Sequence, residues 1–83
     1  MFEKKINHFK ANVEIMLAKK GENQAWLSRT IGMTQQSLRG ILNHGRPTPK
    51  TQRKFIDALE CELSDLTKDV TYEEYGKYRI PRN

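Results

Sequence analysis

The 83-residue chain has a single cysteine and lacks long apolar runs, low-complexity segments and internal repeats. One thiol, Cys61, cannot form an internal disulfide, so we expect a reducing, cytoplasmic environment. No apolar stretch approaches the ~18 residues that a membrane span needs. The charged start at residues 1–5 has no apolar stretch behind it, which argues against a secretory signal. The length predicts one domain with a small core. The lack of an apolar span predicts no membrane partner.

Residue patterns typical of catalysis are also missing. His8 and His44 lie far apart, with no cysteine or further histidine at metal-ligand spacing. Ser28 and Ser37 have no evident base, and phosphate-cradling glycine motifs are absent. The sequence therefore predicts a protein that is not an enzyme and that holds neither a metal nor a cofactor.

Acidic residues are scarce in the middle of the chain. The formal net charge is +5. Residues 22–54 contain six basic residues and one acidic residue, Glu22, whereas residues 55–76 contain seven acidic residues and one basic residue, Lys68. A positive field concentrated in one segment favours an anionic partner, either nucleic acid or an anionic membrane surface.

Residues 24–43 read as two short helices joined by a tight turn. Leu27 and Ile31 lie four residues apart in the first helix, and Gly32 can adopt the positive φ that ends it. Thr34 stands where the N-cap of the second helix belongs. The apolar positions of that second helix recur at helical spacing, at Leu38, Ile41 and Leu42.

The opposite face of the second helix carries amide and guanidinium groups and no carboxylate. Such a surface suits an anionic partner with hydrogen-bonding edges, and DNA is the leading candidate. The face consists of Gln35, Gln36, Arg39, Gly40 and Asn43.

This pattern resembles the helix-turn-helix of the lambdoid phage repressor and Cro family, also called XRE-type or lambda-repressor-like. Besides the apolar positions, the resemblance rests on Gln24 opening the first helix, the small Ser28, Gly32 in the turn, and the run that begins at Thr34. It extends loosely from about Phe9 to Leu66. It implies an all-α domain of about five short helices in residues 1–68 and a tail, residues 69–83, as a candidate dimerisation element.

The resemblance implies roles for individual side chains. Gln35 and Gln36 would read bases, because a glutamine amide matches the N6 and N7 edge of adenine. Arg39 would fork onto a guanine or grip a phosphate, and both alternatives stay open. Gly40 departs from relatives that carry a longer polar side chain there. The DNA backbone would be held by Gln24, Ser37, Asn43, His44, Arg46, Lys50 and Arg53.

Helices are expected on both sides of the motif. The first should begin near Lys4 and end near Lys19, leaving Ile15 off its buried stripe and exposed. Thr48 should cap a helix that ends near Leu59. The buried stripe of the first helix is expected to consist of Ile6, Phe9, Val13, Met16 and Leu17, and the helix after Thr48 should bury Phe55, Ile56 and Leu59. The resemblance implies a further short helix near Leu63 to Leu66 that closes the core.

The tail allows three interpretations. Val70, Tyr72, Tyr78 and Ile80 occupy even positions, as one face of a strand would require. Thr71 and its partner Glu74 fit a capping box, which favours a helical turn before Gly76. A disordered end is the third alternative.

Two side chains differ from those that the family carries at the matching positions. Trp26 either packs across the first or fourth helix or marks a partner surface. Cys61 is expected to be a buried small hydrophobe and not a reactive thiol.

Together these features predict a sequence-specific transcriptional regulator of phage or prophage type, most plausibly a repressor that binds a palindromic operator in double-stranded DNA as a homodimer. It would act at the nucleoid of a bacterial host cell. Two rivals remain open: a helix-turn-helix adaptor or antitoxin with a protein partner or antagonist and secondary DNA binding, and a non-specific nucleoid or membrane-surface binder.

Overall fold

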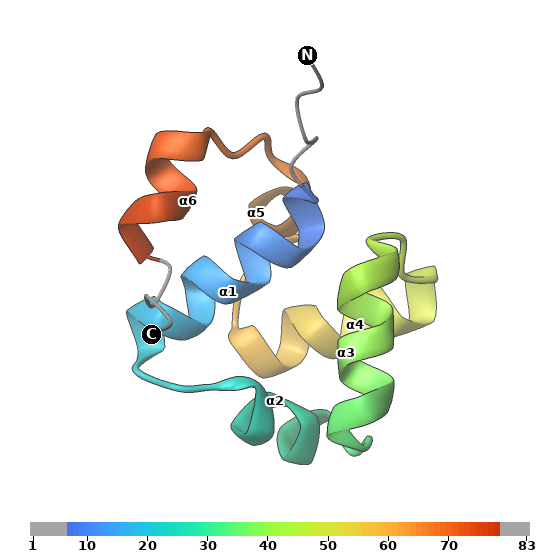
Figure 1. Cartoon of the computed structure of the whole chain (residues 1–83). Coiled ribbons are helices and arrows are strands. Elements are labelled where there is room, and N and C mark those ends of the chain that lie inside the picture. The colour runs from blue at the N-terminus through green and yellow to red at the C-terminus, as the bar shows by residue number, and fades with distance from the viewer. Residues whose placement is uncertain (1–6, 79–83) are drawn as a thin grey trace.

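Six α-helices make up the part of the chain that the computed structural model describes, residues 7–78 (Figure 1). No strand occurs within these residues, so the predicted all-α class is confirmed. The helices are α1 (His8–Lys20), α2 (Gln24–Ile31), α3 (Gln35–His44), α4 (Pro49–Leu59), α5 (Leu63–Thr67) and α6 (Tyr72–Tyr78).

Two threonines start the helices in the middle of the chain. The hydroxyl oxygen of Thr34 accepts the N–H of Ser37 at 3.1 Å, and that of Thr48 accepts the N–H of Thr51 at 3.3 Å. Pro49 follows Thr48 in the first turn of α4, where no amide proton is needed. The predicted starts of α3 and α4 are therefore confirmed.

A left-handed glycine ends α2. Gly32 has φ 78°, its N–H donates to the carbonyl of Arg29, and the N–H of Met33 reaches back to the carbonyl of Ser28 at 2.9 Å. This paired arrangement satisfies carbonyls that the helix end leaves open. It also turns the half-buried Met33 against the core. Three residues, Gly32, Met33 and Thr34, are thus enough to connect α2 to α3.

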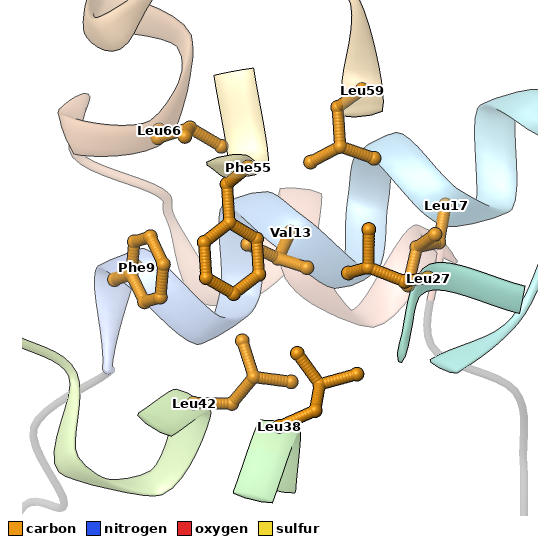
Figure 2. Packing of buried hydrophobic residues seen from close by; sticks show 9 residues of the cluster. All are labelled: Phe9, Val13, Leu17, Leu27, Leu38, Leu42, Phe55, Leu59 and Leu66. Atoms are coloured by element: carbon orange, nitrogen blue, oxygen red, sulfur yellow. The ribbon is translucent and has the colours of Figure 1, made fainter. Parts of the chain in front are cut away.

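The main core draws side chains from α1 to α5, and α3 is fixed to it by two leucines (Figure 2). Leu38 and Leu42 are both 0% exposed. Above them, the rings of Phe9 and Phe55 meet edge to face, with centroids 5.2 Å apart. The nine core residues are Phe9, Val13, Leu17, Leu27, Leu38, Leu42, Phe55, Leu59 and Leu66.

The first helix begins later than expected. Its N-cap is Asn7, whose backbone is extended and whose side chain accepts the N–H of Lys10, so α1 starts at His8 and the predicted start near Lys4 is wrong. The cap overrides the apolar period that suggested a longer helix. The predicted burial of Ile6 lies outside the described residues. Gly21 ends the helix with φ 73°, as expected.

Ile15 is buried, contrary to the prediction. It is 3% exposed and forms a second apolar cluster with Ala11 and Val70, against which the half-buried Tyr75 packs. The first helix therefore buries two faces instead of one. The sequence stripe failed here because the partner of the second face comes from the tail, whose structure was left open.

Residues 72–78 form the helix α6, so the strand and disorder alternatives are wrong for this segment, and the helical alternative is confirmed through the Thr71 half of the predicted capping box. The hydroxyl oxygen of Thr71 accepts the N–H of Glu74 at 3.0 Å. The helix packs on α1, where the Tyr75 hydroxyl donates to the Glu14 carboxylate at 2.7 Å. It continues through Gly76 instead of stopping there. Ile80, which the strand alternative used, lies outside the described residues.

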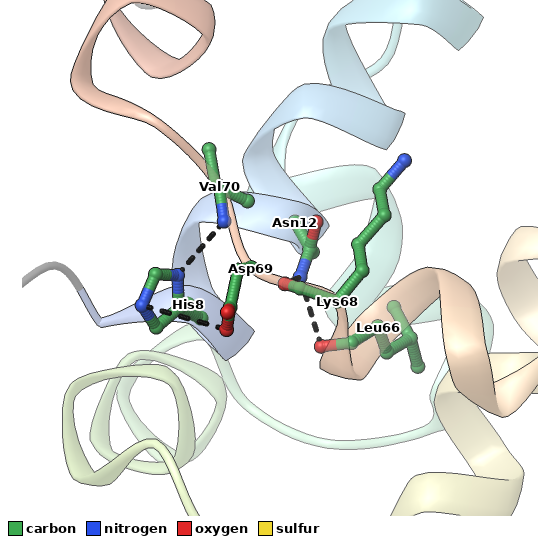
Figure 3. Close-up of polar contacts among 6 residues, drawn as sticks. All are labelled: His8, Asn12, Leu66, Lys68, Asp69 and Val70. Carbon is green, nitrogen blue, oxygen red and sulfur yellow. Dashed lines mark hydrogen bonds and ion pairs between the residues drawn. The ribbon is translucent and has the colours of Figure 1, made fainter.

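A buried asparagine on α1 holds the end of α5. Asn12 is 1% exposed, and its amide N–H groups donate to the carbonyls of Leu66 and Lys68 at 3.1 and 2.8 Å (Figure 3). One turn earlier, His8 Nδ1 accepts the N–H of Val70 at 2.9 Å. These bonds satisfy backbone groups where the chain leaves α5, so α1 fixes the path toward α6.

Several remaining side chains lie at the edge of the core. Trp26, Met16 and Ile56 are half-buried against it, which confirms that Trp26 packs inward. Cys61 is half-buried rather than buried. Its burial, followed by the carboxylates of Asp65 and Glu62, raises the pKa of the Cys61 thiol, which keeps it protonated at neutral pH.

Among residues 7–78, none of the helices combines the length and the apolarity that crossing a bilayer requires.

Ile15→Ala tests the second cluster. We expect the free energy of unfolding to fall by about 2–4 kcal/mol, because a buried branched side chain is deleted and its cavity is only partly refilled. Leu63→Ala is the matched control, since Leu63 is 45% exposed and should cost less than about 1 kcal/mol. Urea unfolding measures both. Equal, small losses would mean that α6 and Val70 do not cover Ile15 in solution.

Candidate nucleic-acid interface

The helix α3 has one buried side and one exposed side. Leu38 and Leu42 point into the core, while Ile41 is half-buried beside them. Helical geometry then places the opposite side outward. We call the exposed residues of that side the α3 ridge: Gln35, Gln36, Arg39, Gly40 and Asn43.

The predicted base-reading residues are all available to a partner. Gln35, Gln36 and Arg39 are exposed on the first two turns of α3. Within residues 7–78, no hydrogen bond or ion pair engages their side chains. Two amides and a guanidinium, unengaged and unaccompanied by a carboxylate on the ridge, can recognise hydrogen-bonding edges on an anionic polymer.

Ser37 already serves the start of α3. The Ser37 N–H donates to the hydroxyl oxygen of Thr34. The Thr34 hydroxyl in turn donates to the Ser37 hydroxyl oxygen at 3.0 Å. This pair fixes the first turn that carries Gln35 and Gln36. Ser37 therefore has a structural role in addition to its predicted contact with the DNA backbone.

The predicted backbone-holding residues surround the ends of the motif. Gln24 is half-buried at the first position of α2, and Asn43 is exposed at the end of α3. Because only four residues separate α3 from α4, the basic residues of this loop and of the first turns of α4 follow directly on the end of α3. The predicted residues of this region are all exposed: His44 at the last position of α3, Arg46 in the loop, and Lys50 and Arg53 on α4.

Most of these charges are not neutralised locally. The one ion pair among them in the described chain joins Arg53 Nε to Asp57 Oδ1 at 4.0 Å, one helical turn apart and exposed on both sides. Such a pair contributes little and leaves the guanidinium accessible. The acidic residues that follow Asp57 in the described chain lie between α4 and α5, on α5, between α5 and α6, and on α6.

Gly40 has no structural reason inside the chain to be a glycine. Its φ is not positive, and a Cβ at this position would meet nothing within 4 Å beyond its own helix. A glycine inside a helix costs about 1 kcal/mol relative to alanine. The missing side chain lowers the middle of the ridge between Gln36 and Asn43.

Two functional candidates escaped the sequence analysis. The Lys10 ammonium on α1 donates to the Asn43 side-chain oxygen at 3.1 Å, and the Asn7 amide donates to the carbonyl of Leu42 at 2.7 Å. Both contacts join the start of α1 to the end of α3, over more than thirty residues of chain. No local pattern signals such a contact.

The described residues hold no group of three or more histidine, cysteine, aspartate or glutamate side chains arranged to bind a metal ion.

Gly45→Ala tests how closely the end of α3 approaches α1. A Cβ on Gly45 would lie 2.9 Å from the Asn7 side-chain oxygen, whereas one on Gly21 would meet nothing, although both glycines have φ near 75°. Both substitutions strain the backbone by about 1–2 kcal/mol. Gly45→Ala should cost about 1 kcal/mol more than Gly21→Ala, because of overlap, in thermal or urea unfolding. Equal costs would show that Asn7 moves aside freely.

Comparison of the chain with protein-family models, with curated proteins and with solved structures found no match.

Proposed function

We propose that this protein is a sequence-specific DNA-binding transcriptional regulator, and that α3 is its recognition helix. It would act as a repressor by occluding polymerase from the DNA that it covers. The proposal rests on one observation above the others: the α3 ridge is exposed and free of carboxylates, and it lies on a helix whose other side fully buries Leu38 and Leu42.

The ridge suits the major groove in shape and in chemistry. An α-helix fits that groove, and the first residues of a recognition helix reach the base edges in helix-turn-helix proteins. Gln35 and Gln36 occupy those first positions here, with Arg39 one turn further along. The two amides would pair with adenine, and Arg39 with guanine or a phosphate.

The surrounding residues supply the sequence-independent grip. Cationic side chains beside the end of α3 would neutralise phosphates and orient the helix. Gln24 at the start of α2 and Asn43 at the end of α3 would hold the DNA backbone on either side of the groove.

The proposal includes a homodimer. A single half-site offers one helix few base contacts, and a two-fold dimer would set two copies of α3 about 34 Å apart on a palindromic operator. The tail helix α6 packs on α1 of its own chain. In Figure 1, α6 lies on the opposite side of α1 from α3, so α6 does not cover the α3 ridge.

Selection of duplexes from a random pool, followed by competition between the selected duplex and random duplex at physiological salt, tests the function. A regulator prefers its selected site by 10³-fold or more, as an order of magnitude. A ratio near one would instead favour a non-specific binder, and absence of any DNA binding would favour the adaptor.

Gln35→Ala should weaken binding to the selected duplex by about 1–3 kcal/mol and flatten the preference at one base pair, since a bidentate base contact is lost. Binding to random duplex should hardly change. Lys50→Ala is the contrasting variant: it should weaken both duplexes equally and reduce the log–log salt slope by about 0.9. Fluorescence anisotropy titrations over a range of salt measure both. Equal losses on both duplexes for Gln35→Ala would contradict its base-reading role.

Gly40→Ala should separate stability from binding. The free energy of unfolding of the variant should rise by about 0.5–1 kcal/mol, because alanine favours the helix and its side chain has open space here. If the bare backbone of Gly40 lies against the groove, its affinity for the selected duplex should fall at the same time. The control is Ala18→Gly at an exposed position of α1, which should destabilise the fold and leave the affinity unchanged. An unchanged affinity of Gly40→Ala would show that α3 does not approach DNA closely at this residue.

A further inference from the structure

We propose that Asn7 is a positioning residue for α3: its side-chain amide fixes the C-terminal end of the recognition helix to the start of α1 and so sets how the ridge enters the groove. The inference rests on the proposed function of the α3 ridge. It adds a residue that touches no DNA itself.

The amide of Asn7 is used at both ends. Its oxygen accepts the N–H of Lys10 at 3.0 Å, which caps α1. Its nitrogen donates to the carbonyl of Leu42 at 2.7 Å and to that of Asn43 at 3.3 Å. One planar group therefore begins one helix and terminates another.

Those two carbonyls need an outside donor. The last four carbonyls of a helix lack an intrahelical partner, and within residues 7–78 the loop amide that bonds to the end of α3 is Gly45 N–H, which donates to Ile41. Asn7 satisfies the next two carbonyls along the chain. Leu38 and Leu42 hold the inner side of α3, and Asn7 adds a fixed point at its end, so the helix cannot tilt freely about its leucines.

The neighbouring contacts require the same close approach. Gly45 lies so near the Asn7 oxygen that a Cβ would be 2.9 Å from it, so a larger residue at this position would have to displace the Asn7 amide. Lys10 donates to the side-chain oxygen of Asn43 at 3.1 Å, which leaves the Asn43 amide N–H groups for an outside acceptor. Asn7 and Lys10 thus orient the residue that closes the ridge.

Loss of this fixed point has a distinctive consequence. Base contacts depend on placing amide and guanidinium groups within hydrogen-bond distance of base edges, whereas phosphate attraction tolerates small shifts. A tilted α3 would therefore lose affinity for its own site while keeping affinity for random DNA. Unfolding would remove both.

The test uses Asn7→Asp in the full-length chain. Aspartate keeps the shape and the capping oxygen but replaces the donor by a carboxylate facing the α3 carbonyls. Asn23→Asp is the matched control. Asn23 caps α2 by accepting the N–H of Trp26 at 2.9 Å, and among the described residues no bond joins its side chain to another element. Both variants change the net charge by one and place it beside a proposed backbone-holding residue, Asn43 or Gln24.

Two measurements are made on each variant. The first is the ratio of affinities for the selected and the random duplex, which Asn7→Asp should lower about tenfold and Asn23→Asp should leave unchanged. The second is amide hydrogen exchange in the free protein. The Gly45 amide should exchange about tenfold faster in Asn7→Asp, whereas the equivalent Gly32 amide of α2 should not.

The proposal would be overturned if Asn7→Asp had the same affinity ratio and the same Gly45 amide exchange rate as the wild-type protein. Asn7 would then serve only as a cap of α1. If the wild-type protein itself shows a ratio near one, the proposed function fails, and Gly45 exchange alone decides whether Asn7 holds α3. If Asn7→Asp does not fold, Asn7→Ser and Asn23→Ser replace the pair, because serine caps a helix without adding charge and cannot reach both carbonyls.

Discussion

The burial of Leu38 and Leu42 is the constraint on which the proposed interface depends. Both side chains are 0% exposed and belong to the same core cluster as Phe55, Leu27 and Val13 (Figure 2). A helix with one side fixed in this way has no freedom to rotate about its axis without exposing leucine to water, at a cost of about 1.5–3 kcal/mol for each side chain. The polar ridge must therefore face outward. Its orientation follows from apolar burial on the other side, not from any contact that the ridge itself makes.

Polar groups on α1 complete what the leucines begin. Within little more than one turn, Asn7, His8 and Asn12 each bond to backbone groups far along the chain. Figure 3 shows the bonds of His8 and Asn12. Asn7 reaches the end of α3, whereas the other two hold the path from α5 to α6. A buried backbone group without a partner costs about 1–3 kcal/mol, so each of these bonds specifies a chain path more than it adds stability. The first helix is thus the element against which both α3 and the tail are placed.

The sequence predicted what local chemistry determines. Gly32, Thr34 and Thr48 act through backbone groups within a few residues, and the end of α2 and the starts of α3 and α4 were foreseen on that basis. It failed where a distant segment decides the outcome. Ile15 was expected in solvent because its partner, Val70, lies in a segment with three open interpretations. Asn7 and Lys10 were missed as neighbours of the ridge for the same reason, since no periodicity relates α1 to the end of α3.

The division of labour within α3 bears on how such an interface can change. Ridge residues contact little of the protein, so substitutions at Gln35, Gln36 or Arg39 alter surface chemistry with small effects on stability. Changes at Leu38 or Leu42 would instead disturb the core, and a change at Asn7 would shift the helix end without altering either surface. The proposed recognition and the folding are therefore assigned to different sides of the same ten residues. In the proposal, what couples them is the placement of the helix as a rigid body, and on this basis a residue at the start of α1 would influence which sequence α3 reads.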